Sequence, residues 1–459
     1  MGSQKFDLLV SRLMDLAQQP ELLLLIAIAV PLILYCSVSP KYRWWVIALW
    51  VFFLPITPVF DWKGVWVAPP FPFNKIVFHG RQISLFLLII LIPAAFKFRG
   101  QNRDAKVPPA LFGLLIMNMV YCIRYLPTDH LEIALTRLFS FLAVFYVLAL
   151  SFPHWVSDRR DIYRYLKASA TGLLLLIFAS LICYVMRPSS VTPGGRFSGL
   201  TSNANYLGAI CGYAMPALLG LSLSPALKIK NRYFWLLAAA FVLLILVWTG
   251  SRTSLGMCGI GIIVIFRAKL GRFLIAGIPL ALFVWLLSYF FQDAQSGAEH
   301  LTSLKNTRIE AWTYYYQMWQ KDLIFGNADL GMKVVENSYL ALASNAGIAG
   351  CAAILVFLFL TAKTCLQLVR LRTNDREVEI LRDIALAGIA AALGNSVFEA
   401  TLLSSLSTNM FWIFLYFTLA DIVINRIAYD PYGNWYLASQ PPYQMLPGQY
   451  GLGVPRYGS

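Results

Sequence analysis

The chain has 459 residues, of which 59% are hydrophobic and only 13% are charged. This composition excludes a set of soluble domains, because a water-soluble protein needs a charged exterior around its apolar interior. The net charge of +15 does not indicate nucleic-acid binding, since Lys and Arg stand in short clusters between apolar runs, which is how membrane topology is set. The composition therefore predicts an all-α, polytopic transmembrane bundle.

The first 21 residues predict an amphipathic helix that lies in the membrane interface. Phe6, Leu9 and Leu13 recur at helical spacing, and charged residues occupy the positions between them. The first apolar run lacks a basic leader, so we expect no cleavable signal peptide.

Residues 22–428 predict the bundle itself, with about 12–14 spans, each able to cross roughly 30 Å of hydrocarbon. We place thirteen spans near 22–38, 43–59, 83–96, 109–126, 131–151, 167–187, 204–223, 233–249, 252–267, 272–290, 338–362, 383–402 and 407–428. The Tyr-, Pro- and Gly-rich residues 429–459 cannot form a packed core and are expected to be a disordered cytoplasmic tail.

The positive-inside rule predicts the orientation of the bundle. One set of alternating loops carries about twice as many Lys and Arg residues as the other, and this richer set is expected to be cytoplasmic. The N-terminus is then outside and the C-terminus inside. The loops at 60–82 and 291–335 also lie outside.

Three outside segments differ from the apolar background, and each contains an arginine: Arg196, Arg252 and Arg308. The first two precede or begin spans that run inward, so the partial positive charge of a helix N-terminus adds to each guanidinium. The third follows Thr307 in a capping box that predicts a helix, with an apolar stripe made of Ile309, Trp312, Tyr316, Trp319 and Leu323. Because a guanidinium matches phosphate oxygens, the three arginines could converge on one anionic group. Each could instead be an ordinary loop or membrane-anchoring residue.

Charged residues inside the spans are a second signal, because charge in lipid is costly and usually paired or functional. Arg137 lies deepest in its span, and Arg124 lies closer to an outside end. Arg137 is either a ligand of the same anion or an ion-pair partner of Glu399.

We expect neither a metal nor a cofactor. The four histidines are scattered, the seven cysteines form no CxxC pair, and no G-x-x-x-x-G-K-[ST] phosphate loop occurs. An outside active site would lack ATP and nucleotide sugars, whereas a lipid-linked diphosphate donor would be available there.

Four short motifs follow one another in the second half of the chain. They are Arg196, Gly199, Asn203 and Asn205, then Ser251-Arg252, then Arg308, Trp312 and Gly326, and finally Asn337, Tyr339, Leu340, Gly347 and Gly350. In this order and spacing the motifs resemble those of the bacterial O-antigen ligase and O-antigen polymerase superfamily. The chain departs from the family in having Ala204 where Pro is usual and Glu336 where ligases carry His.

The resemblance implies a GT-C-like helical bundle in the bacterial inner membrane that transfers glycan units from a polyprenyl diphosphate at the periplasmic face. The implied partners are the polyprenyl-diphosphate-linked glycan, an acceptor glycan or glycolipid, membrane lipids and other polysaccharide-export proteins. Glu336 is the expected catalytic base. The expected diphosphate ligands are Arg196, Arg252, Arg308 and Arg137, and the expected substrate-positioning residues are Asn203, Asn205, Ser251, Asn337 and Tyr339.

Three functions stay open at this stage. The departure at Glu336 favours a polymerase over a ligase that attaches glycan to a lipid A core. A transporter of lipid-linked glycans is the alternative of another class, and it predicts functional residues near the bilayer midplane on broken helices.

Cysteine labelling tests the predicted orientation. In a Cys-free background, a single cysteine at Ser189 should react with a membrane-impermeant reagent added outside intact cells, and one at Asn374 should not. Labelling in the opposite sense would invert the topology and remove the outward-facing site.

Overall fold

The structure is a bundle of helices. The computed structural model describes residues 30–39, 41–58, 67–98, 107–128, 131–156, 159–267, 309–327, 337–404 and 406–427. In these ranges the only β pairing is an isolated bridge between Ile56 and Thr201. Eight of the described helices are long and apolar enough to cross a membrane. The prediction of an all-α polytopic bundle is thus confirmed, and the chain is a multi-pass membrane protein.

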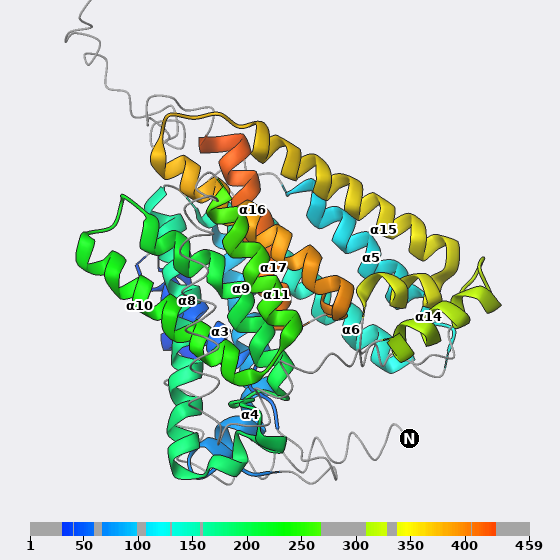
Figure 1. The fold of residues 1–459 in the computed structure, drawn as a ribbon, viewed down its shortest axis with the longest axis horizontal. Coiled ribbons are helices and arrows are strands. Elements are labelled where there is room, and N and C mark those ends of the chain that lie inside the picture. The colour runs from blue at the N-terminus through cyan, green and yellow to red at the C-terminus, as the bar shows by residue number, and fades with distance from the viewer. Residues whose placement is uncertain are drawn as a thin grey trace, which may run out of the picture.

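Figure 1 shows the described helices in chain order. They are α3 (Arg43–Phe53), α4 (Phe73–Phe98), α5 (Pro109–Tyr125), α6 (Leu131–Phe145), α7 (Phe152–Trp155), α8 (Arg159–Met186), α9 (Ala204–Leu223), α10 (Ile229–Thr249), α11 (Arg252–Ile265), α14 (Ile309–Lys321), α15 (Ser338–Arg370), α16 (Arg376–Phe398) and α17 (Thr408–Ile422). Two π-helical turns, Tyr146–Ser151 and Val423–Ile427, continue α6 and α17.

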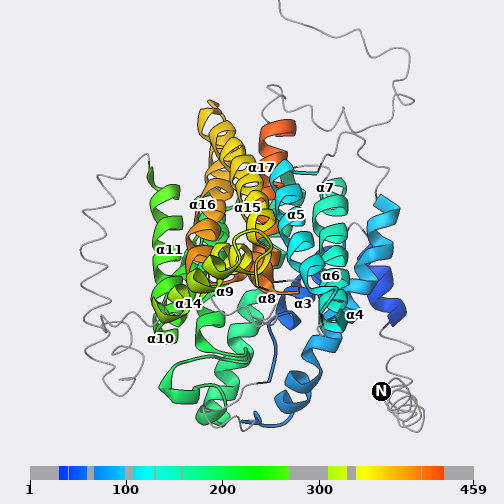
Figure 2. The same cartoon turned by 90° about the vertical axis from the view of Figure 1, so that its right-hand side faces the viewer.

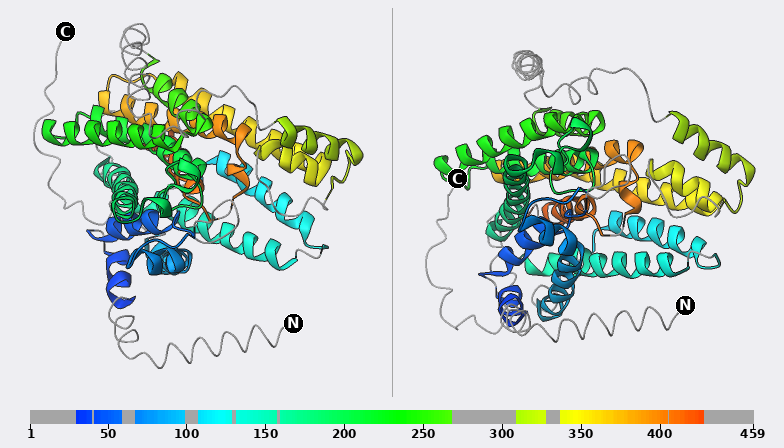
Figure 3. Two further views of the ribbon diagram at one scale, coloured as in Figure 1. Left: turned by 60° about the horizontal axis from the view of Figure 1, so that its bottom comes forward. Right: turned by 90° about the horizontal axis from the view of Figure 1, so that it is seen from below.

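Helices α9 and α17 form the centre of the bundle. In each of them 89% of the most apolar window is buried by other parts of the protein, against 39% in α4, α6 and α10. Figure 2 shows α15, α16, α17 and α5 running side by side, and Figure 3 shows α3 and α4 (blue) on the opposite side of α8 from α10 and α11 (green). The outer helices therefore present apolar side chains to lipid, as expected when only the inner helices are surrounded by protein.

Several predicted boundaries are wrong by about one to three helical turns. Helix α4 begins at Phe73 instead of near residue 83, so part of the predicted 60–82 loop is helical. Helices α8 and α16 likewise begin earlier than predicted, at Arg159 and Arg376, whereas α3 ends at Phe53, before residue 59. Backbone hydrogen bonds continue a helix past the apolar segment that hydropathy detects. The predicted segments 1–21, 272–290 and 429–459 lie outside the described residues.

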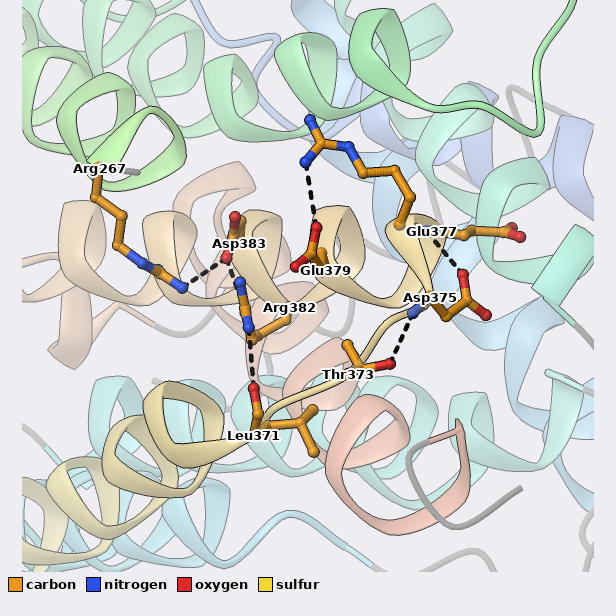
Figure 4. A network of polar contacts seen from close by, with 9 residues as sticks. Arg267, Leu371, Thr373, Asp375, Glu377, Glu379, Arg382 and Asp383 are labelled. Atoms are coloured by element: carbon orange, nitrogen blue, oxygen red, sulfur yellow. Dashed lines mark hydrogen bonds and ion pairs between the residues drawn. The ribbon is translucent and has the colours of Figure 1, made fainter. Parts of the chain in front are cut away.

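The two ends of the bundle differ in their chemistry. Helices α9, α11, α15 and α17 begin at one end, which we call the site end. At the other end, the ion-pair end, basic side chains meet carboxylates across helices. Arg267, just after α11, contacts Asp383 of α16 at 2.8 Å (Figure 4). Arg159 of α8 contacts Asp375 before α16 at 2.6 Å.

The most deeply buried of these ion pairs joins α3 to α8. Arg43 lies 3.6 Å from Asp161, and the side chains of both are 4% exposed. Arg43 also donates a hydrogen bond of 2.6 Å to the Trp155 carbonyl, whereas Arg164, the second partner of Asp161, is 54% exposed. Removing one member of a buried pair leaves the other charge in a poorly solvated place.

We therefore predict unequal effects for two Arg→Gln variants that contact the same carboxylate. Arg43→Gln should lower the free energy of unfolding by about 3 kcal/mol, because Asp161 stays buried with a weakened set of partners. Arg164→Gln should cost less than about 1 kcal/mol, since its charge is solvated. Thermal unfolding of the purified protein in detergent measures both, and equal melting temperatures for the two variants would contradict the buried pair.

Candidate functional site

Arg196 joins the end of one helix to the start of another. Its Nε donates a hydrogen bond of 2.8 Å to the Thr249 carbonyl at the end of α10, and its Nη2 donates one of 2.6 Å to Asn205 Oδ1 in the first turn of α9. Both partners are neutral oxygens, so these bonds fix the guanidinium without cancelling its charge. Arg196 and Asn205, which the sequence predicts as a diphosphate ligand and a substrate-positioning residue, are thus in direct contact.

Arg252 begins α11 directly beyond a tight turn. Gly250 makes the turn possible, because its φ of 65° is a left-handed conformation that favours glycine. The turn packs against α9 at Gly208, where an added Cβ would approach Ser251 Cβ to 2.9 Å. This close contact brings the N-termini of α9 and α11 together.

Arg196 and Arg252 are close enough to influence each other electrostatically. Partial burial and the neighbouring Arg252 guanidinium lower the pKa of Arg196 below its ordinary value. Two like charges at adjoining helix N-termini repel each other, and an anion placed between them would relieve the repulsion. The structure thus brings two of the three predicted arginines into one group, and this group is the candidate site.

The other predicted residues of this region have clear local contacts. Asn203 is exposed and caps α9, accepting a hydrogen bond of 2.8 Å from the Tyr206 amide. Ser251 is buried and its hydroxyl lies 2.7 Å from the Ser254 hydroxyl in the first turn of α11. Capping alone accounts for Asn203.

The start of α15 is built around Asn337. Its Oδ1 accepts hydrogen bonds of 3.0 Å from the amides of Tyr339 and Leu340, and its φ of 53° is unusual for any residue except glycine and asparagine. The Tyr339 hydroxyl lies 2.7 Å from the Ser396 hydroxyl of α16. These contacts fix the backbone directly after Glu336.

Helix α15 is broken inside the bundle at Gly347, where φ is 55° and ψ is −133°. Residues 322–327 fill the break: the Ile348 amide donates to the Ile324 carbonyl at 3.2 Å, and the Asn327 amide donates to the Ser344 carbonyl at 2.8 Å. The backbone groups freed by the break thus find partners within the protein, as an apolar environment requires.

Arg124, at the end of α5, holds this inserted turn in place. Its Nε and Nη2 donate hydrogen bonds of 3.0 Å to the carbonyls of Phe325 and Gly326. Gly326 has a φ of 70°, and an added Cβ would come within 2.5 Å of the Asn345 carbonyl carbon. Only a residue without a side chain fits there.

Arg137 contacts the connection between α16 and α17. Its Nη2 donates a hydrogen bond to the Leu403 carbonyl, and its guanidinium lies over the Tyr121 ring at 4.8 Å from the centroid. The connection also receives Ser338, whose hydroxyl donates to the Glu399 carbonyl at 3.0 Å. The described contacts of Arg137 do not include the ion pair with Glu399 that the sequence left open.

The same connection reaches the centre of the bundle. The Thr408 amide donates to the Tyr206 hydroxyl at 3.1 Å, and the Tyr213 hydroxyl lies 3.4 Å from the Thr401 hydroxyl. Both tyrosines belong to α9. The connection therefore lies between the α9 side of the site end, where Arg196 is found, and the α15 side.

Two key predicted residues, Arg308 and Glu336, lie outside the described residues. The predicted helix after Arg308 is confirmed as α14, and its predicted apolar stripe, expected against the membrane or the bundle, is only partly turned toward the bundle. Tyr315 is buried, whereas Ile309 and Tyr316 are exposed. Trp312 packs on Phe398 of α16, with ring centroids 5.7 Å apart. Contact with α15 and α16 decides which side of α14 turns inward, and periodicity alone does not give this.

The inserted turn and its partners were missed by the site prediction. The sequence indicates Arg124 only as a charge near the end of a span, and it gives no prediction for Asn118. Asn118 donates hydrogen bonds to the carbonyls of Leu114 and Leu402, at 3.0 and 2.9 Å. A polar residue within an apolar run was the available signal. Within the described ranges, no three His, Cys, Asp or Glu side chains gather closely enough to hold a metal ion.

No family model matches the sequence, and no curated protein matches it significantly.

Two substitutions of Asn337 test how much its cap and its positive φ affect stability. Asn337→Ala loses the cap and places a Cβ residue at a positive φ, so it should lower the free energy of unfolding by about 1–2 kcal/mol. Asn337→Gly tolerates the φ and should cost only a few tenths of a kcal/mol. Thermal unfolding in detergent measures this difference. Equal losses from Ala and Gly would contradict the strained cap.

Proposed function

We propose that this chain is a membrane glycosyltransferase that transfers or polymerises glycan units from a polyprenyl diphosphate donor. The observation that carries the proposal is the pairing of Arg196 and Arg252 at the adjoining N-termini of α9 and α11, with Arg196 held by neutral oxygens. A diphosphate is the anion that matches two guanidinium groups and two helix N-termini. The resemblance of the surrounding motifs to O-antigen ligases and polymerases supports the same donor.

The arginines would act on the leaving group. When an acceptor hydroxyl attacks the anomeric carbon, the bond from that carbon to the diphosphate oxygen breaks, and negative charge develops on the diphosphate. Cations already held in place stabilise that charge more in the transition state than in the ground state. Arg196, Arg252 and Arg308 are the proposed ligands. We give Arg137 a positioning part, because its hydrogen bond to the Leu403 carbonyl fixes the α16–α17 connection.

Glu336 is the proposed base. It would take the proton from the attacking hydroxyl, so that the acceptor oxygen gains the glycosyl group as the diphosphate leaves. A single displacement of this kind inverts the anomeric configuration. Asn337, the next residue, is buried and accepts hydrogen bonds from two backbone amides. A base at the position before it would therefore be attached to an anchored residue.

In this proposal the site end faces the periplasm of a bacterial inner membrane, as the distribution of basic loops predicts. Polymerase activity is favoured over ligation to a lipid A core, because Glu336 stands where the ligases have His. In both cases the acceptor is a glycan or glycolipid and the reaction needs neither metal nor cofactor.

One observation favours a transporter as the second candidate. Helix α15 is broken at Gly347, and broken helices are typical of substrate sites in secondary transporters. However, the inserted turn already uses backbone groups at the break, through bonds from Ile348 to Ile324 and from Asn327 to Ser344. Arg124 fixes the turn from the other side. A break occupied by the protein itself supports a structural role more than a substrate site.

Replacement of the arginines by lysine tests whether Arg196 and Arg252 bind the donor diphosphate. Arg196→Lys loses one of its two oriented hydrogen bonds and cannot present a planar fork, so transfer should fall by at least about 100-fold. Arg252→Lys should behave in the same way. Arg187→Lys is the matched control: Arg187 is exposed at the same end and makes a single hydrogen bond of 3.2 Å to the Ala68 carbonyl, which a lysine can replace.

The measurement is transfer of a lipid-linked repeat unit by purified protein, with donor binding followed in parallel. In the same assay Glu336→Gln should retain donor binding and lose turnover, and Glu336→His should restore part of it. Near-wild-type transfer by both Arg→Lys variants would contradict diphosphate binding by Arg196 and Arg252. A fully active Glu336→Gln variant would show that another group is the base.

A further inference from the structure

A small cleft opens at the ion-pair end between α9, α11 and α16. Its volume is about 60 Å³, several times the roughly 10–15 Å³ that a single water molecule needs. One part of its lining is charged and contains Arg376 and Asp383. The rest is apolar or small: Gly220, Leu223, Ile265, Phe266, Ile380 and Ile384.

The charges around the cleft leave an excess of one positive charge. Asp383 accepts a contact of 2.8 Å from Arg267 and one of 2.9 Å from Arg382, so one carboxylate faces two guanidinium groups (Figure 4). Arg376 pairs with Glu379 at 3.2 Å, but its side chain is 59% exposed. A single negative charge would balance this cluster.

A second, independent observation points to an acceptor that the described protein does not supply. The Nη1 atom of Arg267, whose side chain is 33% exposed as a whole, is buried and has no hydrogen-bond partner among the described residues. A buried guanidinium nitrogen without an acceptor is costly, because it has lost its water without gaining a partner.

The apolar part of the lining comes from all three helices, and on α16 Ile380 and Ile384 alternate with Arg376 and Asp383. Gly220 creates its floor: an added Cβ would come within 2.1 Å of Ile384 Cδ1. Leu223 and Phe266 are half-buried at the ends of α9 and α11. Such walls would be of no use to a free inorganic ion, but they fit a hydrocarbon chain.

We propose that this cleft binds an anionic phospholipid. The phosphodiester, with one negative charge, lies between Arg376 and Arg267, and the first part of an acyl chain lies along Leu223, Phe266 and Ile380. Basic clefts between transmembrane helices are typical binding places of anionic lipid headgroups. The lipid would bridge α9, α11 and α16 at the end opposite to the arginine pair, and the proposal does not depend on the transfer reaction.

Native mass spectrometry of the full chain tests the site. Protein purified in detergent should retain added phosphatidylglycerol more strongly than phosphatidylcholine. Arg376→Gln, which removes an exposed side chain and should not disturb folding, is expected to weaken phosphatidylglycerol binding about tenfold. Arg372→Gln is the matched control, because Arg372 is exposed at the same end but does not line the cleft.

A second variant and a second ligand separate a lipid from a free ion. Leu223→Ser should weaken phosphatidylglycerol binding while leaving any effect of inorganic phosphate on the melting temperature unchanged. Equal losses from Arg376→Gln and Arg372→Gln would overturn the proposal. So would equal retention of the two lipids, or competition by inorganic phosphate that abolishes lipid retention.

Discussion

Inside a bilayer, a backbone amide, a carbonyl or a guanidinium group must find its partner within the protein, because the hydrocarbon offers none. The break in α15 shows this constraint at its clearest. Gly347 interrupts the helix, and the turn at residues 322–327 supplies replacement hydrogen bonds while Arg124 binds the turn's carbonyls. The end of the long loop before α15 is thereby tied to the bundle, close in sequence to the predicted base.

Arginine side chains have different partners at the two ends of the bundle. At the ion-pair end, arginines such as Arg43 and Arg159 meet carboxylates from other helices, which joins α3 to α8 and α8 to the start of α16. At the site end, Arg124, Arg137 and Arg196 donate to carbonyl or amide oxygens. Neutral acceptors orient a guanidinium but leave its charge available to an anion, so the site end is suited to a diphosphate.

The sequence predicted the parts of this structure that depend on hydropathy and on local capping. The apolar runs predict the helices, the Ser251-Arg252 turn coincides with the start of α11, and the capping box at Thr307 predicts α14. Boundaries such as the start of α4 at Phe73 were missed, because a helix continues where hydropathy falls.

Local sequence patterns do not predict the tertiary contacts between helices. Three features depend on how distant segments pack. Arg196 binds Asn205 and the end of α10, Tyr315 of α14 faces the bundle, and residues 322–327 fill the break in α15. Asn118 and Arg124 carried a signal, as polar residues beside apolar runs, but no partner could be assigned from sequence alone. Periodicity assigns faces to helices, and it does not choose their neighbours.

The central claim is that the arginine pair serves bond breaking at a diphosphate, and its most direct test follows the fate of the donor. Purified protein in liposomes would be given a polyprenyl diphosphate carrying a labelled repeat unit, together with an acceptor glycan. The account predicts free polyprenyl diphosphate and a longer glycan, formed in equal amounts. Recovery of the donor intact in the opposite leaflet, with no free diphosphate, would contradict it and identify a transporter.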